Sequence, residues 1–388
     1  MTDLATRAAP ARSGALRRAA PALLGYAAVR ALGLLVLALW SAARGKSAHT
    51  LLTARWDALW YTRVAELGYG YEVRLPNGDV HSNLAFFPLL PWLERLVAAV
   101  SPLSYADGGL AVSLLASLAA AWGIFAVADH VYGRRAGICA VLLWAVLPVG
   151  IVQSMAYSES LFTALAAWSL YAVLTGRWVT AGALALLAGL TRPVGLAVVA
   201  AVWAAGLAPF ARGRRTAPPH GTRPGARALG LLLAPLGTVG YVLWVGQRTG
   251  RGPLGYLDVQ AGWRNGFDGG YAFARFVAGK FTSFPSALAG LGLVAGVALV
   301  IWLYAVCVRQ RQPLPLLVYA GVVTALALCA SSYFGSKPRL LLPAFPLLLP
   351  LARALARLRT PRSALVMASV AAGSAVYGAF WLNGSGPP

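Results

Sequence analysis

The sequence has few acidic residues, few cysteines and few histidines. Only 11 of its 388 residues are Asp or Glu, against 33 Lys and Arg, and there are 3 Cys and 4 His. The cysteines, Cys139, Cys307 and Cys329, all stand in apolar stretches, which argues against a disulfide framework or a zinc site. No G-x-x-x-x-G-K-[ST] pattern is present, so no nucleotide-binding loop is indicated. We therefore expect no metal and no cofactor, although a divalent metal ion stays open as an alternative.

Long apolar runs dominate the rest of the chain. Hydrophobic residues make up 59% of the sequence and the mean hydropathy is +0.67, more apolar surface than a soluble domain can bury. The net charge of +22 gathers in short clusters between apolar runs, as in membrane proteins, so we expect a lipid bilayer and no nucleic acid as partner. We predict an all-α polytopic membrane protein with about 11 transmembrane segments. The predicted segments are 21–42, 106–129, 136–153, 158–176, 178–191, 193–210, 227–247, 285–308, 314–333, 339–352 and 363–382.

The basic clusters also predict an orientation. Residues 1–20 would form a cytoplasmic tail before a retained anchor, and 21–388 an integral membrane domain of the plasma membrane. With the N-terminus inside, the Arg-rich loop at about 211–226 is cytoplasmic and the C-terminus lies outside. Two long loops, at about 43–105 and 248–284, then face outward.

Three finer features are also predicted. The first outward loop would contain a short helix at 55–67 and, at 83–103, a helix lying in the membrane interface. The short segments 178–191 and 193–210 indicate one broken excursion around Arg192. Arg30, inside the first segment, must either reach the interface or face a partner.

Asp57 is the leading candidate for a catalytic base. Nine of the eleven acids fall on the outer side of this topology, and Asp57 stands in "RWDALWYTRVAELGY", just after the first segment. Trp56, Trp60 and Tyr61 flank it, and such aromatic residues pack against lipid or a sugar face. A partly desolvated carboxylate is a stronger base, but Asp is also a preferred helix cap, and the two roles are compatible.

Four further charged residues are candidates for the site. Glu159, in "YSESLF", either favours the start of a helix or lines an outward cavity. Arg192, in "LTRPVGL", either forms a structural ion pair or binds a phosphate. Lys337 and Arg339, in "KPRLLLPAFPLLLP", are either interfacial anchors or a second basic spot at the outer face.

Together these stretches resemble a known group of enzymes. The sequence is similar to the GT-C superfamily of polyprenyl-phosphate-sugar-dependent glycosyltransferases, and within it to bacterial relatives of the GPI mannosyltransferase 2 (PIG-V) family. The match runs from about residue 55 to about residue 350. The stretches that carry it, in order, are "RWDALWYTRVAELGY", "AFFPLLPWLERL", "YSESLF", "LTRPVGL" and "KPRLLLPAFPLLLP".

The resemblance implies a fold and a reaction. It implies a GT-C-type helix bundle with a long first extracytoplasmic loop and an active site facing away from the cytoplasm. It also implies a lipid-phosphate-linked mannose donor, an inverting transfer, and a base supplied by an acid of the first outward loop, here Asp57. Many GT-C enzymes carry two adjacent acids there, whereas Asp57 stands alone between Trp56 and Ala58, which puts a metal site built on an acid pair in doubt. The acceptor of the PIG-V family does not carry over.

The functional hypothesis is an inverting transfer of mannose from a polyprenyl-phosphate-linked donor to an extracytoplasmic glycan or glycolipid acceptor. Asp57 would deprotonate the acceptor hydroxyl, and cationic side chains would neutralise the leaving phosphate. The predicted phosphate-binding residues are Arg192, Lys337 and Arg339. The predicted substrate-binding residues are Trp56, Trp60, Tyr61 and Glu159.

Two alternatives stay open. The first is a GT-C transferase that uses another polyprenyl-phosphate sugar, such as glucose, arabinose or galactose. The second is a transporter or flippase of lipid-linked sugars, which would share the broken segment and the buried arginine. Transporters commonly show two related halves and carry charges near the midplane of several helices, and the sequence shows neither pattern. A non-enzymatic scaffold would leave Arg192 unexplained.

Overall fold

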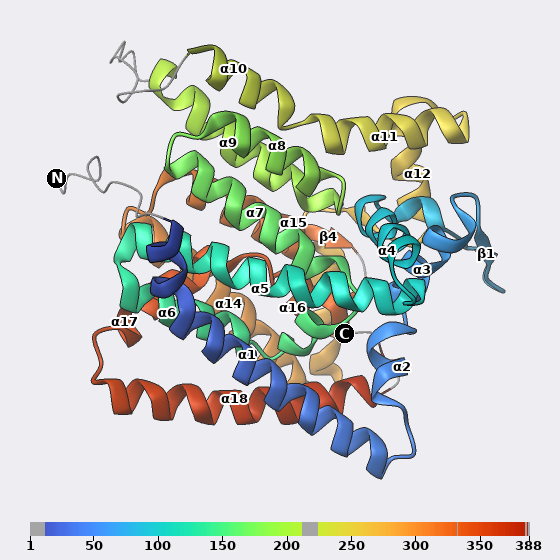
Figure 1. The fold of residues 1–388 in the computed structure, drawn as a ribbon. Helices are drawn as coiled ribbons and strands as arrows, with labels where there is room; N and C mark the ends of the chain where they lie inside the picture. The colour runs from blue at the N-terminus through green and yellow to red at the C-terminus, as the bar shows by residue number, and fades with distance from the viewer. Residues whose placement is uncertain (1–11, 212–223, 332, 385, 387–388) are drawn as a thin grey trace.

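The computed structural model describes residues 12–211, 224–331, 333–384 and 386, and these form a mainly helical bundle (Figure 1). Residues 1–11 of the predicted tail and 212–223 of the predicted cytoplasmic loop lie outside the described residues. The helices of the N-terminal half are α1 (Arg12–Ala43), α2 (Ala48–Thr53), α3 (Asp57–Leu67), α4 (Leu89–Val100), α5 (Tyr105–Tyr132), α6 (Arg134–Ala145), α7 (Ser158–Leu174), α8 (Trp178–Gly189) and α9 (Leu196–Ala211). Those of the C-terminal half are α10 (Pro224–Leu233), α11 (Leu236–Thr249), α12 (Gly255–Gly262), α13 (Tyr271–Gly279), α14 (Ser286–Arg309), α15 (Leu314–Cys329), α16 (Lys337–Leu340), α17 (Leu349–Leu355) and α18 (Thr360–Leu382).

Four short strands complete the fold as two antiparallel pairs. Strand β1 (Glu72–Arg74) pairs with β2 (Val80–Ser82). Strand β3 (Gly266–Phe267) pairs with β4 (Ala330–Ser331), with Gly266 opposite Ser331. The second pair joins the predicted outward loop 248–284 to the segment that leads into α16.

Fewer helices are long enough to cross a bilayer than the eleven segments predicted. Among the described residues, five helical stretches are long and apolar enough to cross a bilayer, namely those in α1, α5, α10–α11, α14 and α18. A bent pair, Phe334–Leu340 with Phe345–Leu355 at 74°, would make a sixth. The apolar helices α7, α8, α9 and α15 are shorter, and the 12 residues of α8 extend only about 18 Å against a hydrocarbon core of about 30 Å. The predicted segment 136–153 ends its α-helix at Ala145. The predicted count of about eleven is therefore not confirmed.

Polar contacts gather several helix termini at one end of the bundle. Arg18 in α1 pairs with Asp129 near the end of α5 at 2.8 Å, and Arg134 at the start of α6 donates to the Arg18 carbonyl at 3.2 Å. Arg135 donates to the Leu358 carbonyl, just before α18, at 3.0 Å. The end of α5 and the starts of α1, α6 and α18 thus share one side of the molecule.

Polar contacts also join chain segments at the opposite end of the bundle. Lys46, just after α1, donates to the Asn383 carbonyl at 2.6 Å, and Arg55 donates to the Leu382 carbonyl at 3.3 Å. His49 and Asp107, at the start of α5, lie 2.6 Å apart. These contacts place α2 and α3 beside the end of α18, and Figure 1 shows α2, α3, α4 and the β1–β2 hairpin on that side.

Arg30 in α1 faces a partner inside the bundle. Its guanidinium is buried and donates to the carbonyls of Ala145 and Gly150. Ala145 ends α6, and a helix C-terminus leaves carbonyls unpaired that attract a cation. Of the two predicted alternatives for Arg30, the structure therefore shows the partner.

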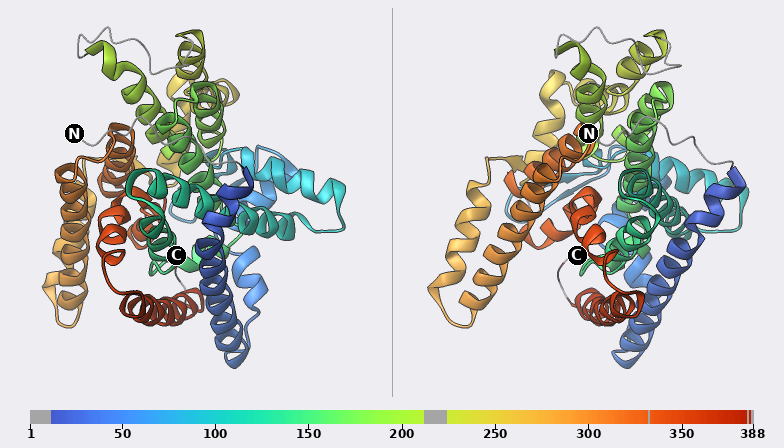
Figure 2. Two further views of the ribbon diagram at one scale, coloured as in Figure 1. Left: turned by 60° about the vertical axis from the view of Figure 1, so that its left-hand side comes forward. Right: turned by 90° about the vertical axis from the view of Figure 1, so that its left-hand side faces the viewer.

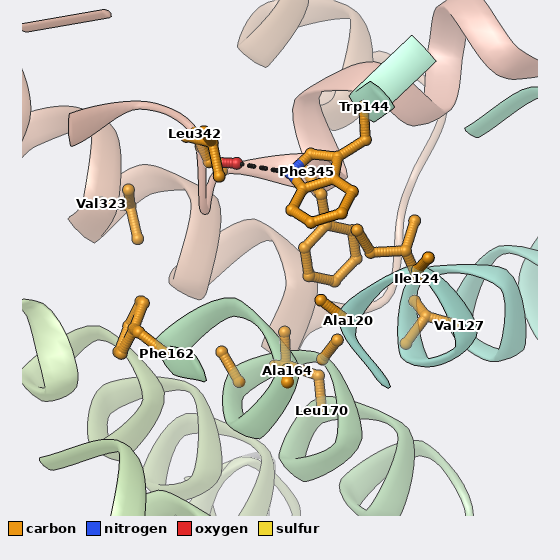
Figure 3. Close-up of a cluster of buried hydrophobic side chains, with 14 of the residues drawn as sticks. Ala120, Ile124, Val127, Trp144, Phe162, Ala164, Leu170, Val323, Leu342 and Phe345 are labelled. Atoms are coloured by element: carbon orange, nitrogen blue, oxygen red, sulfur yellow. Dashed lines mark hydrogen bonds between the residues drawn. The ribbon is translucent and has the colours of Figure 1, made fainter. Parts of the chain in front are cut away.

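The core of the bundle lies where α5, α6 and α7 meet the segment before α17 (Figure 3). Trp144 is fully buried there, stacks on Tyr26 of α1 at 5.5 Å between centroids, and donates its indole N–H to the Leu342 carbonyl at 3.1 Å. Small residues let other helices approach closely. A Cβ on Gly182 of α8 would lie 2.3 Å from the Gly230 carbonyl oxygen of α10, so this crossing requires glycine.

The predicted short helix and interfacial helix of the first long loop are both present as helices. Helix α3 covers Asp57–Leu67 and α4 covers Leu89–Val100. Trp92, Leu96 and Val100 of α4 are exposed, which gives this helix an apolar outer face suited to a membrane interface.

Candidate functional site

The site begins at the turn before α3. Trp56 takes φ 50° and ψ −122°, a backbone conformation that costs a bulky residue about 1–3 kcal/mol and occurs mostly at functional sites. The Arg55 guanidinium lies over the Trp56 ring at 4.0 Å. Trp56 holds the capping position and Asp57 is the first helical residue, so the prediction that Asp57 caps α3 is wrong. The carboxylate is free to face other elements.

The partner of Asp57 is Arg339 of α16. Arg339 Nη1 donates to Asp57 Oδ2 at 2.8 Å, and Arg339 Nε lies 3.3 Å from Oε1 of Glu159. The Asp57 side chain is 25% exposed, whereas that of Arg339 is 9% exposed. The Tyr157 ring packs under this guanidinium at 5.1 Å. The contact thus joins α3 to α16 across a long sequence separation and leaves part of Asp57 open to a substrate.

Glu159 binds a second arginine. Its Oε1 lies 2.5 Å from Arg192 Nη1, and its side chain is only 1% exposed. Arg192 lies at the break between α8 and α9, where it is extended at φ −159° and ψ 154° because the next residue is Pro193. This confirms the predicted break around Arg192. At the break Thr191 and Gly195 are buried, whereas Pro193 is exposed.

A hydroxyl pair completes the cluster. Tyr61, one helical turn after Asp57 in α3, bonds the Ser158 hydroxyl at 2.7 Å, and Arg192 Nη1 donates to the same hydroxyl at 3.1 Å. Burial raises the pKa of Tyr61 above its ordinary range, so its OH keeps its proton and serves as a neutral hydrogen-bonding group. Tyr61 is thereby placed to hold α3 against α7, and its predicted contact with substrate stays a prediction.

The charges of this cluster balance. Two carboxylates, Asp57 and Glu159, face two guanidinium groups, Arg192 and Arg339. Removing either partner of a buried pair leaves an uncompensated charge, which is strongly destabilising. The four side chains therefore depend on one another for charge compensation, and we call them the four-charge unit, or the Asp57 unit. Glu159, predicted to bind substrate, is instead almost fully enclosed between its two arginines.

Lys337 is not part of this unit. Its ammonium donates to the Ala327 and Ala330 carbonyls at 2.7 and 2.8 Å, at the end of α15, and lies 4.7 Å from the Phe273 ring centroid. Lys337 and Arg339 are two residues apart on a helix, so they point about 200° apart around its axis. The two were predicted to act together, and the structure separates them.

An aromatic cluster lies next to the charged unit. Trp60, three residues after Asp57 in α3, stacks on Phe86 with ring centroids 5.7 Å apart and meets Trp263 edge-on at 4.8 Å. Trp263 follows α12 and stacks on His81 of β2 at 4.0 Å. Both predicted outward loops thus meet at Trp60. Phe86, Trp263 and Ser158 were not among the predicted site residues, although "AFFPLLPWLERL" and "YSESLF" contain two of them.

No group of three or more His, Cys, Asp or Glu side chains placed to hold a metal ion occurs in the part of the chain that the structure describes. The expectation of no metal and no cofactor stays a prediction.

Comparison with solved structures places this geometry in a known fold. No protein-family profile and no curated protein matches the sequence. ArnT from Cupriavidus metallidurans bound to undecaprenyl phosphate matches with a TM-score of 0.53 at 18% identity, over 88% of this chain and 61% of that chain. The apo form of the same ArnT matches with a TM-score of 0.50 at 18% identity, over 79% of this chain and 55% of that chain. The chain therefore shares the fold of ArnT.

The likeness to ArnT and the five long apolar helical stretches among the described residues support a multi-pass membrane protein. Archaeal AglB from Archaeoglobus fulgidus, in complex with an inhibitory peptide and a dolichol-phosphate, has a TM-score of 0.47 at 12% identity, over 94% of this chain and 56% of that chain. This chain spans 61% and 55% of the length of the two ArnT chains that it matches.

Proposed function

We propose that the chain is an inverting glycosyltransferase that moves mannose from a polyprenyl-phosphate-linked donor to an acceptor outside the cytoplasm. The observation that carries the proposal is a partly exposed carboxylate, Asp57, bonded to Arg339 in a four-charge unit within a GT-C fold. The acceptor would be a glycan or a glycolipid, and the site would face the outer side of the plasma membrane. The undecaprenyl phosphate of ArnT supports a lipid-phosphate donor.

Asp57 would act as the base. The acceptor hydroxyl loses its proton to Asp57 Oδ, and its oxygen forms a bond to the anomeric carbon from the face opposite the phosphate. The bond between that carbon and the phosphate oxygen breaks, and the phosphate keeps the electron pair. Asp57 is the most exposed member of the unit, with 25% of its side chain accessible against 12% for Arg192, 9% for Arg339 and 1% for Glu159.

The charge balance links the base to the leaving group. Before transfer, Arg339 is paired with Asp57 and cannot give its full charge to a phosphate. When Asp57 takes up the proton it becomes neutral, and the Arg339 guanidinium is released just as negative charge develops on the leaving phosphate. Arg192, held by Glu159 and 12% exposed, would assist from the other side. Lys337 would act only through its support of α15 and α16.

The aromatic residues would form the sugar-binding wall. Trp60 and Trp263 come from the two long loops, and sugar rings pack on such surfaces. Trp56 would contribute beside Asp57. Transport of lipid-linked sugars is the less favoured reading, because the matching fold is that of transferases.

The decisive experiment is the Asp57→Asn variant assayed with polyprenyl-phosphate mannose, with released polyprenyl phosphate as the product measured. We expect turnover to fall about 100-fold or more, the usual contribution of a general base. Asp258→Asn, an exposed acid of α12, is the matched control and should keep wild-type turnover. A loss of less than about threefold, under 1 kcal/mol of barrier, would reject Asp57 as the base.

The same assay tests the donor. Glucose-, arabinose- and galactose-linked donors are run beside the mannose donor at equal concentration. If one of these releases polyprenyl phosphate faster than the mannose donor does, the transferase assignment stands and the mannose assignment is wrong.

A further inference from the structure

A hollow of about 440 Å³ opens on the surface between α13 with Lys280, which follows it, and Phe334, outside the Asp57 unit. The rings of Phe276 and Phe334, with centroids 4.7 Å apart, form its aromatic wall. The Lys280 ammonium lies 4.6 Å from the Phe276 centroid, and Arg275 lines the same hollow. Two cations and two aromatic rings thus surround one small space.

The positive charge of the hollow is not compensated. Among the described residues, no carboxylate lies within ion-pairing distance of Arg275 or Lys280. Asp268, the acid that precedes α13, instead accepts the backbone N–H groups of Gly270 and Ala272, each at 2.9 Å. An anion that enters the hollow would therefore meet two available cations, one of which can form bidentate hydrogen bonds.

The surroundings of the neighbouring helix α14 indicate which class of anion would bind in the hollow. Helix α14 is the least buried of the five candidate spans, and Figure 2 shows it at the edge of the bundle. Leu288 and Leu291 on its first turns are exposed, as are Phe281 and Phe284 just before it. With α14 crossing a bilayer, we expect these apolar side chains to contact acyl chains and the hollow near the start of the helix to lie close to the lipid head groups.

We propose that this hollow binds the phosphate of an anionic phospholipid, with Arg275 and Lys280 on the phosphate and the acyl chains along α14. Cations near an anionic leaflet attract its lipids, and here the rings fix their position. The site does not depend on the proposed transferase activity. It is distinct from the four-charge unit, because none of its lining residues contacts Asp57, Glu159, Arg192 or Arg339 through a hydrogen bond or ion pair within the described chain.

The test is a titration of dioleoylphosphatidylglycerol into the purified full chain in a neutral detergent, followed by native mass spectrometry. The Arg275→Gln/Lys280→Gln double variant should bind the lipid about tenfold more weakly than wild type. Arg309→Gln/Arg311→Gln removes the same charge at the other end of α14 and should change binding less than threefold. If the double variant does not fold, each single variant is measured and should show about a threefold loss.

Three further arms keep the proposal falsifiable. Dioleoylphosphatidylcholine should bind more weakly than the anionic lipid, and millimolar inorganic phosphate should not displace it. Polyprenyl phosphate should bind the double variant as it binds wild type. Unchanged lipid binding in the double variant, equal losses in both double variants, displacement by phosphate alone, or loss of polyprenyl phosphate binding would each overturn the assignment.

Discussion

At the scale of single residues, Glu159 holds two arginines with one buried carboxylate. It contacts Arg192 at 2.5 Å and Arg339 at 3.3 Å, and it is too enclosed to meet a sugar directly. Glu159 would therefore affect a reaction only by holding the two guanidinium groups in place. In the proposed mechanism Glu159 is therefore a positioning residue, whereas Asp57 is the residue that touches the substrate.

Glu159→Gln tests this role. The change keeps the side-chain shape but leaves two buried arginines with one carboxylate, so we expect a loss of stability of about 3–5 kcal/mol. Thermal unfolding in detergent measures the loss, and turnover of the lipid-phosphate donor should fall at least tenfold in the protein that remains folded. Glu72→Gln, an exposed acid of β1, is the control and should match wild type. A Glu159→Gln variant that melts and turns over like wild type would contradict the positioning role.

At the scale of elements, the packing of α4 on α5 encloses a second unusual carboxyl group. Glu94 of α4 is fully buried, and neither of its oxygens has a hydrogen-bond partner among the described residues. A Cβ on Gly109 of α5 would lie 2.6 Å from Glu94 Oε1, so glycine makes room for this side chain. The adjacent Arg95 donates to the Val64 and Ala65 carbonyls of α3 instead. Burial raises the pKa of Glu94 to about 9.

This pKa predicts how stability depends on pH. Between the ordinary pKa of 4.5 and about 9, folded Glu94 keeps a proton that the unfolded chain releases. Stability contributed by this residue therefore falls as pH rises through that window, with a limiting slope of about 1.4 kcal/mol per pH unit, and it is flat outside the window. The glutamine of the Glu94→Gln variant cannot ionise. The thermal stability of this variant relative to wild type should therefore increase as the pH is raised from 5 to 8.

The matched control for this pH series is Glu66→Gln, an exposed acid near the end of α3. It should track wild type at every pH. If the difference between Glu94→Gln and wild type stays constant from pH 5 to pH 8, Glu94 titrates normally in the folded protein.

At the scale of the whole molecule, polar contacts join helix termini at each end of the bundle, and the bundle therefore has two distinct sides. The contacts of Arg18 with Asp129 and of Arg135 with Leu358 gather termini on one side. The Asp57 unit belongs to the other side, because α3 follows Arg55, which bonds the end of α18. The positive-inside rule predicts that the Arg-rich side faces the cytoplasm, and with that orientation the proposed reaction would take place outside.

Cysteine labelling checks this orientation in cells. In a background without Cys139, Cys307 and Cys329, Asn77→Cys sits in the β1–β2 turn and Arg359→Cys sits before α18. A membrane-impermeant maleimide should label the first in intact cells and the second only after permeabilisation. The reverse pattern would place the Asp57 side in the cytoplasm and exclude the proposed topology.

The sequence alone determined the apolar helical character of the fold and singled out the four charged residues of the cluster, Asp57, Glu159, Arg192 and Arg339. Apolar runs require a membrane, the scarcity of acids draws attention to Asp57 and Glu159, and an arginine followed by proline between short segments indicates a break. The tertiary structure decided which charges meet. Arg339 reaches Asp57 while Lys337, two residues away, reaches the end of α15, because a helical turn sends these side chains in different directions. Local pattern cannot fix pairings between residues that are hundreds of positions apart, since these depend on how the helices pack.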